Sequence, residues 1–261
     1  MCIRDRYSLS LSKLWRESDV RFSIGYANTS LQDVTPMTSN VAYSNFTGVA
    51  TIDRNNPTVA QSNHVIPERI TATLRYQPVT IEGGYRFKAS LFINRFQSRS
   101  YSYTYDGEEH GQTPAFTDQS LLYVPTNAAD PNVVFDGISP SAFFAITDAA
   151  GCPRGQYCPR NSIDGAWNTS INLKLAQEFP GFAPDHEAEI YMVIKNLGNL
   201  INSKYGIFRE PGFPSMQKVA RLSEIDDEGR YVYDRLYSPR GSSISPYAST
   251  YEVKFGFYYR F

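Results

Sequence analysis

The sequence predicts an all-β protein, namely part of an antiparallel transmembrane β-barrel to which this chain contributes about seven strands. Three observations predict this fold. Seven segments alternate apolar and polar residues, the connections between them are short and long in turn, and four lysines of these segments fall on the polar side of the alternation. Because successive side chains of a β-strand point to opposite faces of a sheet, each segment has one apolar and one polar face.

The last eleven residues show the alternation most clearly. Their apolar series consists of Tyr251, Val253, Phe255, Phe257, Tyr259 and Phe261. A period of two over this length fits a strand and not a helix. The other six predicted strands, in chain order, are 7–15, 20–31, 69–77, 85–94, 166–179 and 186–196.

The connections between these strands alternate in length. In chain order, short and long in turn, they are 16–19, 34–66, 78–84, 105–164, 180–185 and 197–249. Compact soluble domains rarely contain three structureless loops of that size. Outer-membrane barrels combine short periplasmic turns with long extracellular loops. If Phe261 lies in the periplasm, every short connection falls on the periplasmic side and every long one outside.

Composition fits a membrane barrel, although alternation by itself leaves a protein core as the other environment for the apolar faces. Aromatic residues make up 14% of the 261 residues, and the mean hydropathy is −0.39, which suits a barrel that alternates lipid-facing and lumen-facing residues. Lys88, Lys174, Lys195 and Lys254 fall in the polar register, whereas a lysine facing lipid would cost about 2–4 kcal/mol at mid-bilayer. The net charge of −1 gives no case for nucleic acid.

The amino terminus predicts a fragment. Residues 1–6 are interpreted as translated sequencing-adapter sequence, which excludes Cys2 from the fold, and the chain then starts directly in a strand without a secretory signal. Residues 7–261 are therefore expected to be one carboxy-terminal portion of a barrel. As an odd number of strands with two unpaired edges, that portion is expected to form an open, curved sheet when alone.

Five stretches carry a resemblance to a known family through their order and spacing. They are SNVAYSNF (39–46), YSYTYDGEEHGQTPAFTDQSLLYVPT (101–126), GQYCPRNSIDGAWNTSINLKLAQEFPGF (155–182), IKNLGNLINSKYG (194–206) and YEVKFGFYYRF (251–261). Together they resemble the carboxy-terminal barrel of TonB-dependent outer-membrane receptors, in particular the Oar-like branch, over most of residues 7–261. Two places depart from that branch. Glu68-Arg69 stands where His-Arg is expected, and Glu108, Glu109 and His110 stand where Asp and Asn are usual.

The resemblance implies a barrel of about 22 strands, of which this chain holds the last third, in the outer membrane of a Gram-negative-type bacterium. It implies uptake of an unidentified extracellular ligand, driven by the TonB complex through a plug that residues 7–261 do not contain. The implied partners are outer-membrane lipid, the barrel assembly machinery, the TonB complex and that ligand. No cofactor and no enzymatic activity are expected, because the sequence holds no convincing set of nucleophile, base and orienting residue.

The terminal strand also resembles the signal by which the assembly machinery recognises outer-membrane proteins. An unpaired strand offers backbone groups for β-augmentation, and its alternate aromatic side chains can enter pockets of a receptor. The simpler interpretation is that the same residues, Tyr251 to Phe261, face lipid.

Two cysteines are candidates for a disulfide. Cys152 and Cys158 lie in the longest predicted extracellular loop, where an oxidising compartment and a short ring with Pro and Gly favour oxidation. The alternative, a metal site, needs further ligands, and none lies nearby in the sequence. His64, His110 and His186 are scattered over different connections.

Aromatic and acidic loop residues have a functional and a structural interpretation. Tyr101, Tyr103, Tyr105 and Phe116 could stack on a sugar or siderophore, but such residues are more often girdle residues or the small core of a folded loop. Residues 224–231 could bind calcium, but are better explained as a hairpin turn in which Gly229 has a positive φ. Residues 196–202 are expected to be a strand end and a turn held by Asn side chains.

Two other functions remain open at this point. One keeps the barrel without TonB, as a passive porin or an adhesin-like protein. The other is a secreted β-rich module whose exposed aromatic residues bind carbohydrate.

Overall fold

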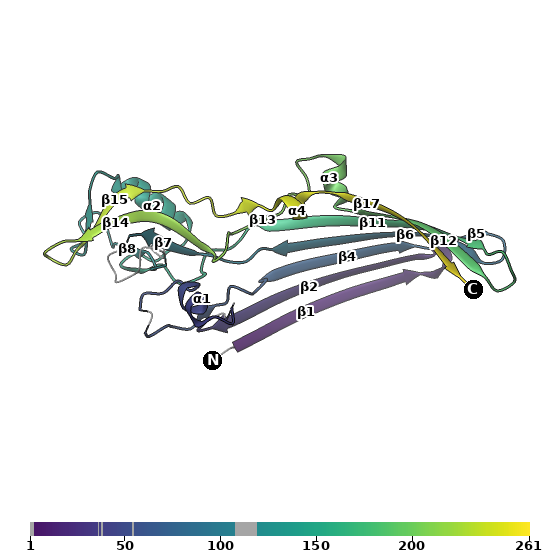
Figure 1. Cartoon of the computed structure of the whole chain (residues 1–261), viewed down its shortest axis with the longest axis horizontal. Helices are drawn as coiled ribbons and strands as arrows, with labels where there is room; N and C mark the ends of the chain where they lie inside the picture. Colours follow the sequence, from purple (N-terminus) through teal and green to yellow (C-terminus); the bar gives the residue numbers. More distant parts are fainter. Residues whose placement is uncertain (1–2, 36, 38, 54, 108–118) are drawn as a thin grey trace.

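A computed structural model describes residues 3–35, 37, 39–53, 55–107 and 119–261 of the chain. Seven long strands lie side by side, each antiparallel to its neighbours, and form the main sheet (Figure 1). Their order across the sheet is β1 (Ile3–Trp15), β2 (Val20–Asp33), β4 (Glu68–Tyr76), β6 (Tyr85–Gln97), β11 (Trp167–Pro180), β12 (Glu187–Lys195) and β17 (Glu252–Arg260). These are the seven strands predicted from the alternation.

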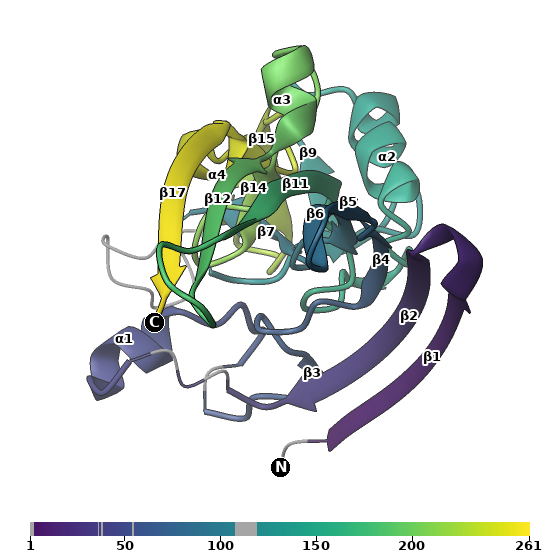
Figure 2. The same ribbon diagram turned by 90° about the vertical axis from the view of Figure 1, so that its right-hand side faces the viewer.

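The main sheet is open and curved. It runs as an arc from β1 to β17 (Figure 2), and these two strands are its edges. Two short strands extend it, β3 (Ala60–Gln61) beside β2 and β5 (Val79–Ile81) beside β6. The prediction of an all-β, antiparallel fold is therefore confirmed, and no closed barrel forms among the residues that the structure describes.

The first strand is longer than predicted. Residues 3–6 continue β1 and pair with residues 29–32 of β2, so that Arg6 lies opposite Thr29. This pairing does not bear on the origin of residues 1–6, and their interpretation as adapter sequence stays a prediction.

Short connections lie at one end of the main sheet, which we call the turn end. There η1 (Arg16–Ser18) joins β1 to β2, and Asp19 closes it with a φ of 52°. β5 lies in the connection between β4 and β6, and residues 181–186 join β11 to β12. The turn end is at the right of Figure 1.

Long connections lie at the opposite end and are not structureless, which corrects the sequence-based expectation. They contain a four-stranded sheet in the order β7 (Ser102–Asp106), β14 (Met216–Ile225), β15 (Tyr231–Leu236) and β9 (Val133–Phe135). Two two-stranded sheets pair β8 (Tyr123–Val124) with β10 (Gln156–Tyr157), and β13 (Arg209–Glu210) with β16 (Ser243–Ile244). The helices are α1 (Ala42–Thr47), α2 (Pro140–Ala149), α3 (Leu197–Ile201) and α4 (Pro246–Ser249).

The hydrophobic core lies in these connections. It is formed by β7, β8, β9, β10, β14, β15 and α2, which together we call the loop module, and its fully buried side chains include Leu122, Phe143 and Tyr233. None of the fifteen buried residues of this cluster belongs to the seven long strands. The main sheet and the loop module therefore bury their apolar residues in different ways.

Cross-strand register divides the main sheet into an apolar and a polar face. One row of directly paired residues on the apolar face, from β2 to β17, is Phe22, Leu74, Leu91, Leu173, Ile194 and Val253. The adjacent row of the polar face is Arg21, Arg75, Ser90, Lys174, Val193 and Lys254. Apolar side chains on the first face are most exposed on the edge strands, as in Leu11 at 64% and Phe255 at 77%. On the inner strands they are mostly half-buried, and Ile194 is buried at 8%.

Residues 196–202 differ in part from the prediction. They contain the short helix α3 in place of a simple turn. The expected side-chain bonds to the backbone do form, because Asn196 Nδ2 donates to the carbonyl of Gly206 at 2.8 Å and Asn199 Nδ2 to that of Tyr205 at 3.1 Å. Among the described residues, no helix has the length and apolarity that a membrane crossing requires.

Candidate functional site

Cross-strand ion pairs neutralise the four lysines of the polar face. Lys88 contacts both Glu178 and Glu189, with 2.8 Å to the Glu189 carboxylate, and Lys174 lies 3.3 Å from Glu189. Nearer β17, Glu252 accepts from Lys195 at 2.9 Å and from Lys254 at 3.0 Å. The carboxylates of β11, β12 and β17 on this face are thus engaged by lysines of the same face or, for Glu187, by Arg260 at 2.6 Å.

The strongest candidate for a ligand site is a pocket of about 510 Å³ at the loop end of the polar face, which we call the mouth pocket. Ser170 and Asn172 of β11 and Lys195 of β12 lie on its sheet side. Its remaining lining residues are Asn196, Phe208, Tyr247, Ala248, Thr250, Tyr251 and Glu252.

Local hydrogen bonds hold this pocket together. Asn172 Oδ1 accepts from the backbone N–H of Asn196 at 2.9 Å, which fixes the end of β12 against β11. Phe208 N–H donates to Ser249 Oγ at 3.0 Å and so ties the two covering segments to each other. Tyr247 is 97% exposed at the pocket.

The lining of the mouth pocket suits a polar ligand that has an apolar face. Amide, hydroxyl and ion-pair groups can exchange hydrogen bonds with hydroxyls, and rings such as Phe208 and Tyr247 can contact C–H surfaces. Sugars have both kinds of surface. Sequence reasoning did not reveal this pocket, because its residues come from four separate stretches of the chain.

The predicted terminal series occupies two places. Val253, Phe255, Phe257 and Tyr259 lie in β17, in register with the apolar residues of β12. Tyr251 precedes the strand and lines the mouth pocket, and Phe261 follows the strand and is 92% exposed. The role of this series as an assembly signal stays a prediction.

The hydroxyl of Tyr259 fixes the adjacent turn. It accepts from the backbone N–H of Phe182 at 3.0 Å and lies 2.8 Å from His186 Nδ1. His186 thus has a structural contact at the turn end, His64 lies in the connection before β4, and His110 lies outside the described residues.

The tyrosines of β7 and its flank are buried. Tyr101, Tyr103 and Tyr105 are 8%, 6% and 2% exposed and belong to the core of the loop module. This burial favours the core interpretation over stacking on a ligand. Phe116, the fourth residue of that candidate set, lies outside the described residues.

Burial also keeps these phenols neutral. Loss of solvation raises the pKa of Tyr103 to about 12 and also raises the pKa of Tyr105 and Tyr233 well above the usual value of a phenol. As neutral donors they can form ordinary hydrogen bonds, as Tyr233 does to the carbonyl of Tyr123 at 3.0 Å.

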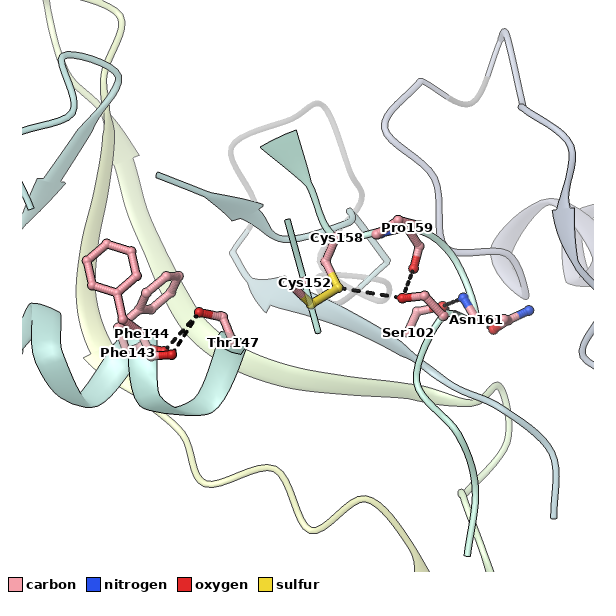
Figure 3. Close-up of a disulfide and its surroundings, with 9 residues drawn as sticks. Ser102, Phe143, Phe144, Thr147, Cys152, Cys158, Pro159 and Asn161 are labelled. Carbon is pink, nitrogen blue, oxygen red and sulfur yellow. Dashed lines mark hydrogen bonds between the residues drawn. A yellow bond between two sulfur atoms is a disulfide. The ribbon is translucent and has the colours of Figure 1, made fainter. Parts of the chain in front are cut away.

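Cys152 and Cys158 form a disulfide with a Cα–Cα distance of 4.9 Å (Figure 3). It links the segment after α2 to the segment after β10, and the backbone N–H of Cys158 donates to the carbonyl of Leu122 at 2.8 Å. Gly155, within the ring between the cysteines, and Gly151, directly before it, both have a φ of 71°, a conformation that glycine adopts readily. In the part of the chain that the structure describes, no three or more His, Cys, Asp or Glu side chains are grouped to hold a metal ion.

Replacing both cysteines with serine should lower the free energy of unfolding of the loop module by about 2 kcal/mol, because a short ring no longer restricts the unfolded chain. Denaturant unfolding followed by near-ultraviolet circular dichroism measures this change. Dithiothreitol should have the same effect on the parent chain and none on the double variant. Equal stability of all these forms would contradict the prediction.

Residues 224–231 form the hairpin turn between β14 and β15. Asp226 Oδ1 accepts from the backbone N–H groups of Glu228 at 3.1 Å and Arg230 at 2.8 Å, and Arg230 Nε contacts the other oxygen at 2.7 Å. Gly229 has a φ of 79°. The Asp226 carboxylate is thus used within the turn, which favours the turn interpretation over a calcium site.

A buried polar network joins the loop module to β2, and the sequence did not reveal it. Arg160 is 6% exposed and donates to the backbone carbonyls of Asp33 at 2.5 Å and Val34 at 2.8 Å. Next to it, Asn161 donates from Nδ2 to the carbonyl of Gln61 at 2.7 Å, and its backbone N–H donates to Ser102 Oγ at 2.8 Å (Figure 3). These bonds connect residues that lie 59 to 127 positions apart in the chain.

Comparison with known proteins gives no relative. No protein-family model matches the chain, and neither the curated proteins nor the solved structures contain a significant match.

Proposed function

We propose that this chain is part of the wall and outer loops of an outer-membrane β-barrel that serves as a TonB-coupled receptor. One observation carries the membrane part of the proposal. The apolar face continues in register across the main sheet with half-buried to exposed side chains, apart from the buried Ile194, and the one hydrophobic core cluster of the described residues contains none of its strands. Lipid supplies the apolar surroundings that such a face needs.

The distribution of charged residues supports the same assignment, in which the apolar face contacts lipid and the polar face contacts water. Lys88, Lys174, Lys195 and Lys254 pair with Glu178, Glu189 and Glu252 on the polar face, as expected for a surface that faces an aqueous lumen, whereas Lys13 of the edge strand β1 lies in the apolar register opposite Phe22. Long connections gathered at one end and tight turns at the other match an outer and a periplasmic side.

TonB coupling rests on the resemblance of the five stretches quoted above, and the mouth pocket gives it a place for a ligand. A folded loop module beside a polar pocket suits capture of an extracellular solute with hydroxyl groups. The lining also suits the second candidate function, a secreted carbohydrate-binding module. The two candidates differ in what covers the apolar face.

Two tryptophans allow a direct test of the membrane proposal. Trp15 lies at the turn end of the apolar face, where it pairs with Val20 of β2. Trp167 lies at the loop end, where it pairs with Gln97 of β6. The distance between these ends corresponds to about eight residues of β11, or roughly 26 Å along the strand. Counted with both ends, this span is close to the roughly 9–11 residues of a tilted transmembrane strand, and outer-membrane barrels carry aromatic residues at both borders of their apolar band.

The test places single-tryptophan variants, Trp15→Phe and Trp167→Phe, in phosphatidylcholine vesicles with bromine at different depths of the acyl chain. We expect each remaining tryptophan to be quenched most by bromine close to the headgroups and less by bromine at the bilayer centre. A chain that stays in solution without detergent and shows no quenching would overturn the membrane proposal and favour the secreted module. Recovering the reading frame upstream of Tyr7 tests the TonB part, since a passive porin has no plug-coding region.

A further inference from the structure

Four arginines surround a pocket of about 350 Å³ at the turn end of the polar face. Arg16 belongs to η1, Arg21 to β2, Arg75 to β4 and Arg86 to β6. We call this group the arginine corner. Its pocket is also lined by Leu14, Asp19 and Gln77.

The arginine corner has more positive than negative charge. Asp19 is the one carboxylate in the lining, and it lies 3.5 Å from Arg86, which also donates to the carbonyl of Gln77 at 2.6 Å. Among the described residues, Arg16, Arg21 and Arg75 form no ion pair, and Glu178 and Glu189 of the same face are engaged by Lys88 and Lys174. Four guanidinium groups thus face one carboxylate.

Two of these arginines are placed where they destabilise the sheet. Arg21 and Arg75 lie directly opposite each other in the register of β2 and β4, on the same face. Like charges in directly opposed positions reduce the stability of a sheet. Local arrangements that cost stability without a compensating contact are typical of functional sites.

We propose that the arginine corner binds an acidic peptide segment that lies across the turn end of the polar face and contributes two or more carboxylates. The guanidinium groups come from three adjacent strands, so they extend over two strand spacings, or about 10 Å. One small anion does not reach across that width, whereas carboxylates at alternate positions of an extended peptide do. Arginine is suited to this role because its planar fork holds a carboxylate through two bonds.

The inference does not depend on the membrane proposal. The register of Arg21 with Arg75 and the lack of a carboxylate partner remain the same whether lipid or water covers the opposite face. Failure of one proposal therefore leaves the other unchanged.

The probe is the fluorescently labelled peptide acetyl-Asp-Gly-Asp-Gly-Asp-amide, titrated by anisotropy against the chain in uncharged dodecyl maltoside micelles at low salt. The Asn-Gly counterpart and inorganic phosphate serve as competitors. Arg75→Gln should weaken peptide binding about tenfold or more, which is the effect of one charge-assisted hydrogen bond. Arg69→Gln is the matched control, because Arg69 lies on the same strand and face but outside the pocket, and it should change binding less than about twofold.

Three results would overturn the proposal. They are absence of binding to the parent chain, equal weakening by Arg69→Gln and Arg75→Gln, and displacement by phosphate as effective as that by the aspartate peptide. A second measurement distinguishes loss of the binding site from misfolding of the variant. Without peptide, Arg75→Gln should raise the urea midpoint of the main sheet at low salt and Arg69→Gln should not, whereas saturating peptide should remove that difference.

Discussion

Replacing Phe143 with alanine should destabilise the loop module by about 3–5 kcal/mol, the usual cost of removing a fully buried aromatic ring. Phe143 is completely buried in the module core. Its ring centroid lies 5.5 Å from that of Phe135 and 5.7 Å from those of Phe144 and Tyr233, with the last pair stacked. The module also has no other layer that could move into the space, because the long strands contribute nothing to its core.

Denaturant unfolding followed by near-ultraviolet circular dichroism of the module tyrosines measures this effect. Phe182→Ala is the matched control, since Phe182 is 97% exposed and lies in the short connection between β11 and β12. Its replacement should change stability by no more than about 0.5 kcal/mol. A loss below about 1 kcal/mol for Phe143→Ala would show that the module does not depend on this packing.

The long strands could be predicted from the sequence because each carries its own signal. A segment such as 166–179 alternates over many residues, and every second side chain faces the same surroundings. Alternation assigned each side chain to a face, and the structure places the apolar residues in common rows, as in the pairing of Leu74 with Leu91 and Leu91 with Leu173. Which residue pairs with which in a neighbouring strand was not predicted.

The loop module could not be predicted in this way. In β7, Tyr alternates with Ser and Thr, a pattern typical of a half-exposed strand, yet Ser102, Tyr103, Thr104 and Tyr105 are all buried. In a strand that is covered on both faces, the side chains of both faces are buried, so alternation in the sequence no longer predicts which of them are exposed. Its partner β14 runs parallel to it and begins at Met216, more than a hundred residues away, and no local pattern encodes that pairing.

The candidate sites also differ in whether local sequence could predict them. The Cys152–Cys158 pair was accessible to sequence reasoning, because the two residues lie close in the chain. The arginine corner was not, since Arg21 and Arg75 meet only through the register of β2 with β4. Residues that meet across a sheet can be assigned to a site once the register is known.

Introducing a lysine on the apolar face should be far more costly than introducing it one residue away. Ile24 lies midway along β2 on the apolar face, opposite Leu11 and Ala72, whereas Ser23 lies on the polar face opposite Ser12 and Thr73. If lipid covers the apolar face, Ile24→Lys should cost about 2–4 kcal/mol, as a lysine does at the bilayer midplane. Ser23→Lys should cost less than about 1 kcal/mol, because a polar lumen solvates the charge.

Urea unfolding in phosphatidylcholine vesicles, followed by tryptophan fluorescence, measures both variants. Ile24→Ser separates the loss of the apolar side chain from the cost of the charge and should fall between the two lysine variants. In the secreted-module alternative, water covers the half-exposed Ile24 side chain and solvates a lysine there as well as one at Ser23. Equal stability of Ile24→Lys and Ser23→Lys would therefore show that lipid does not cover the apolar face. A difference of the predicted size and sign would not arise in a sheet surrounded by water, because water would solvate both lysines.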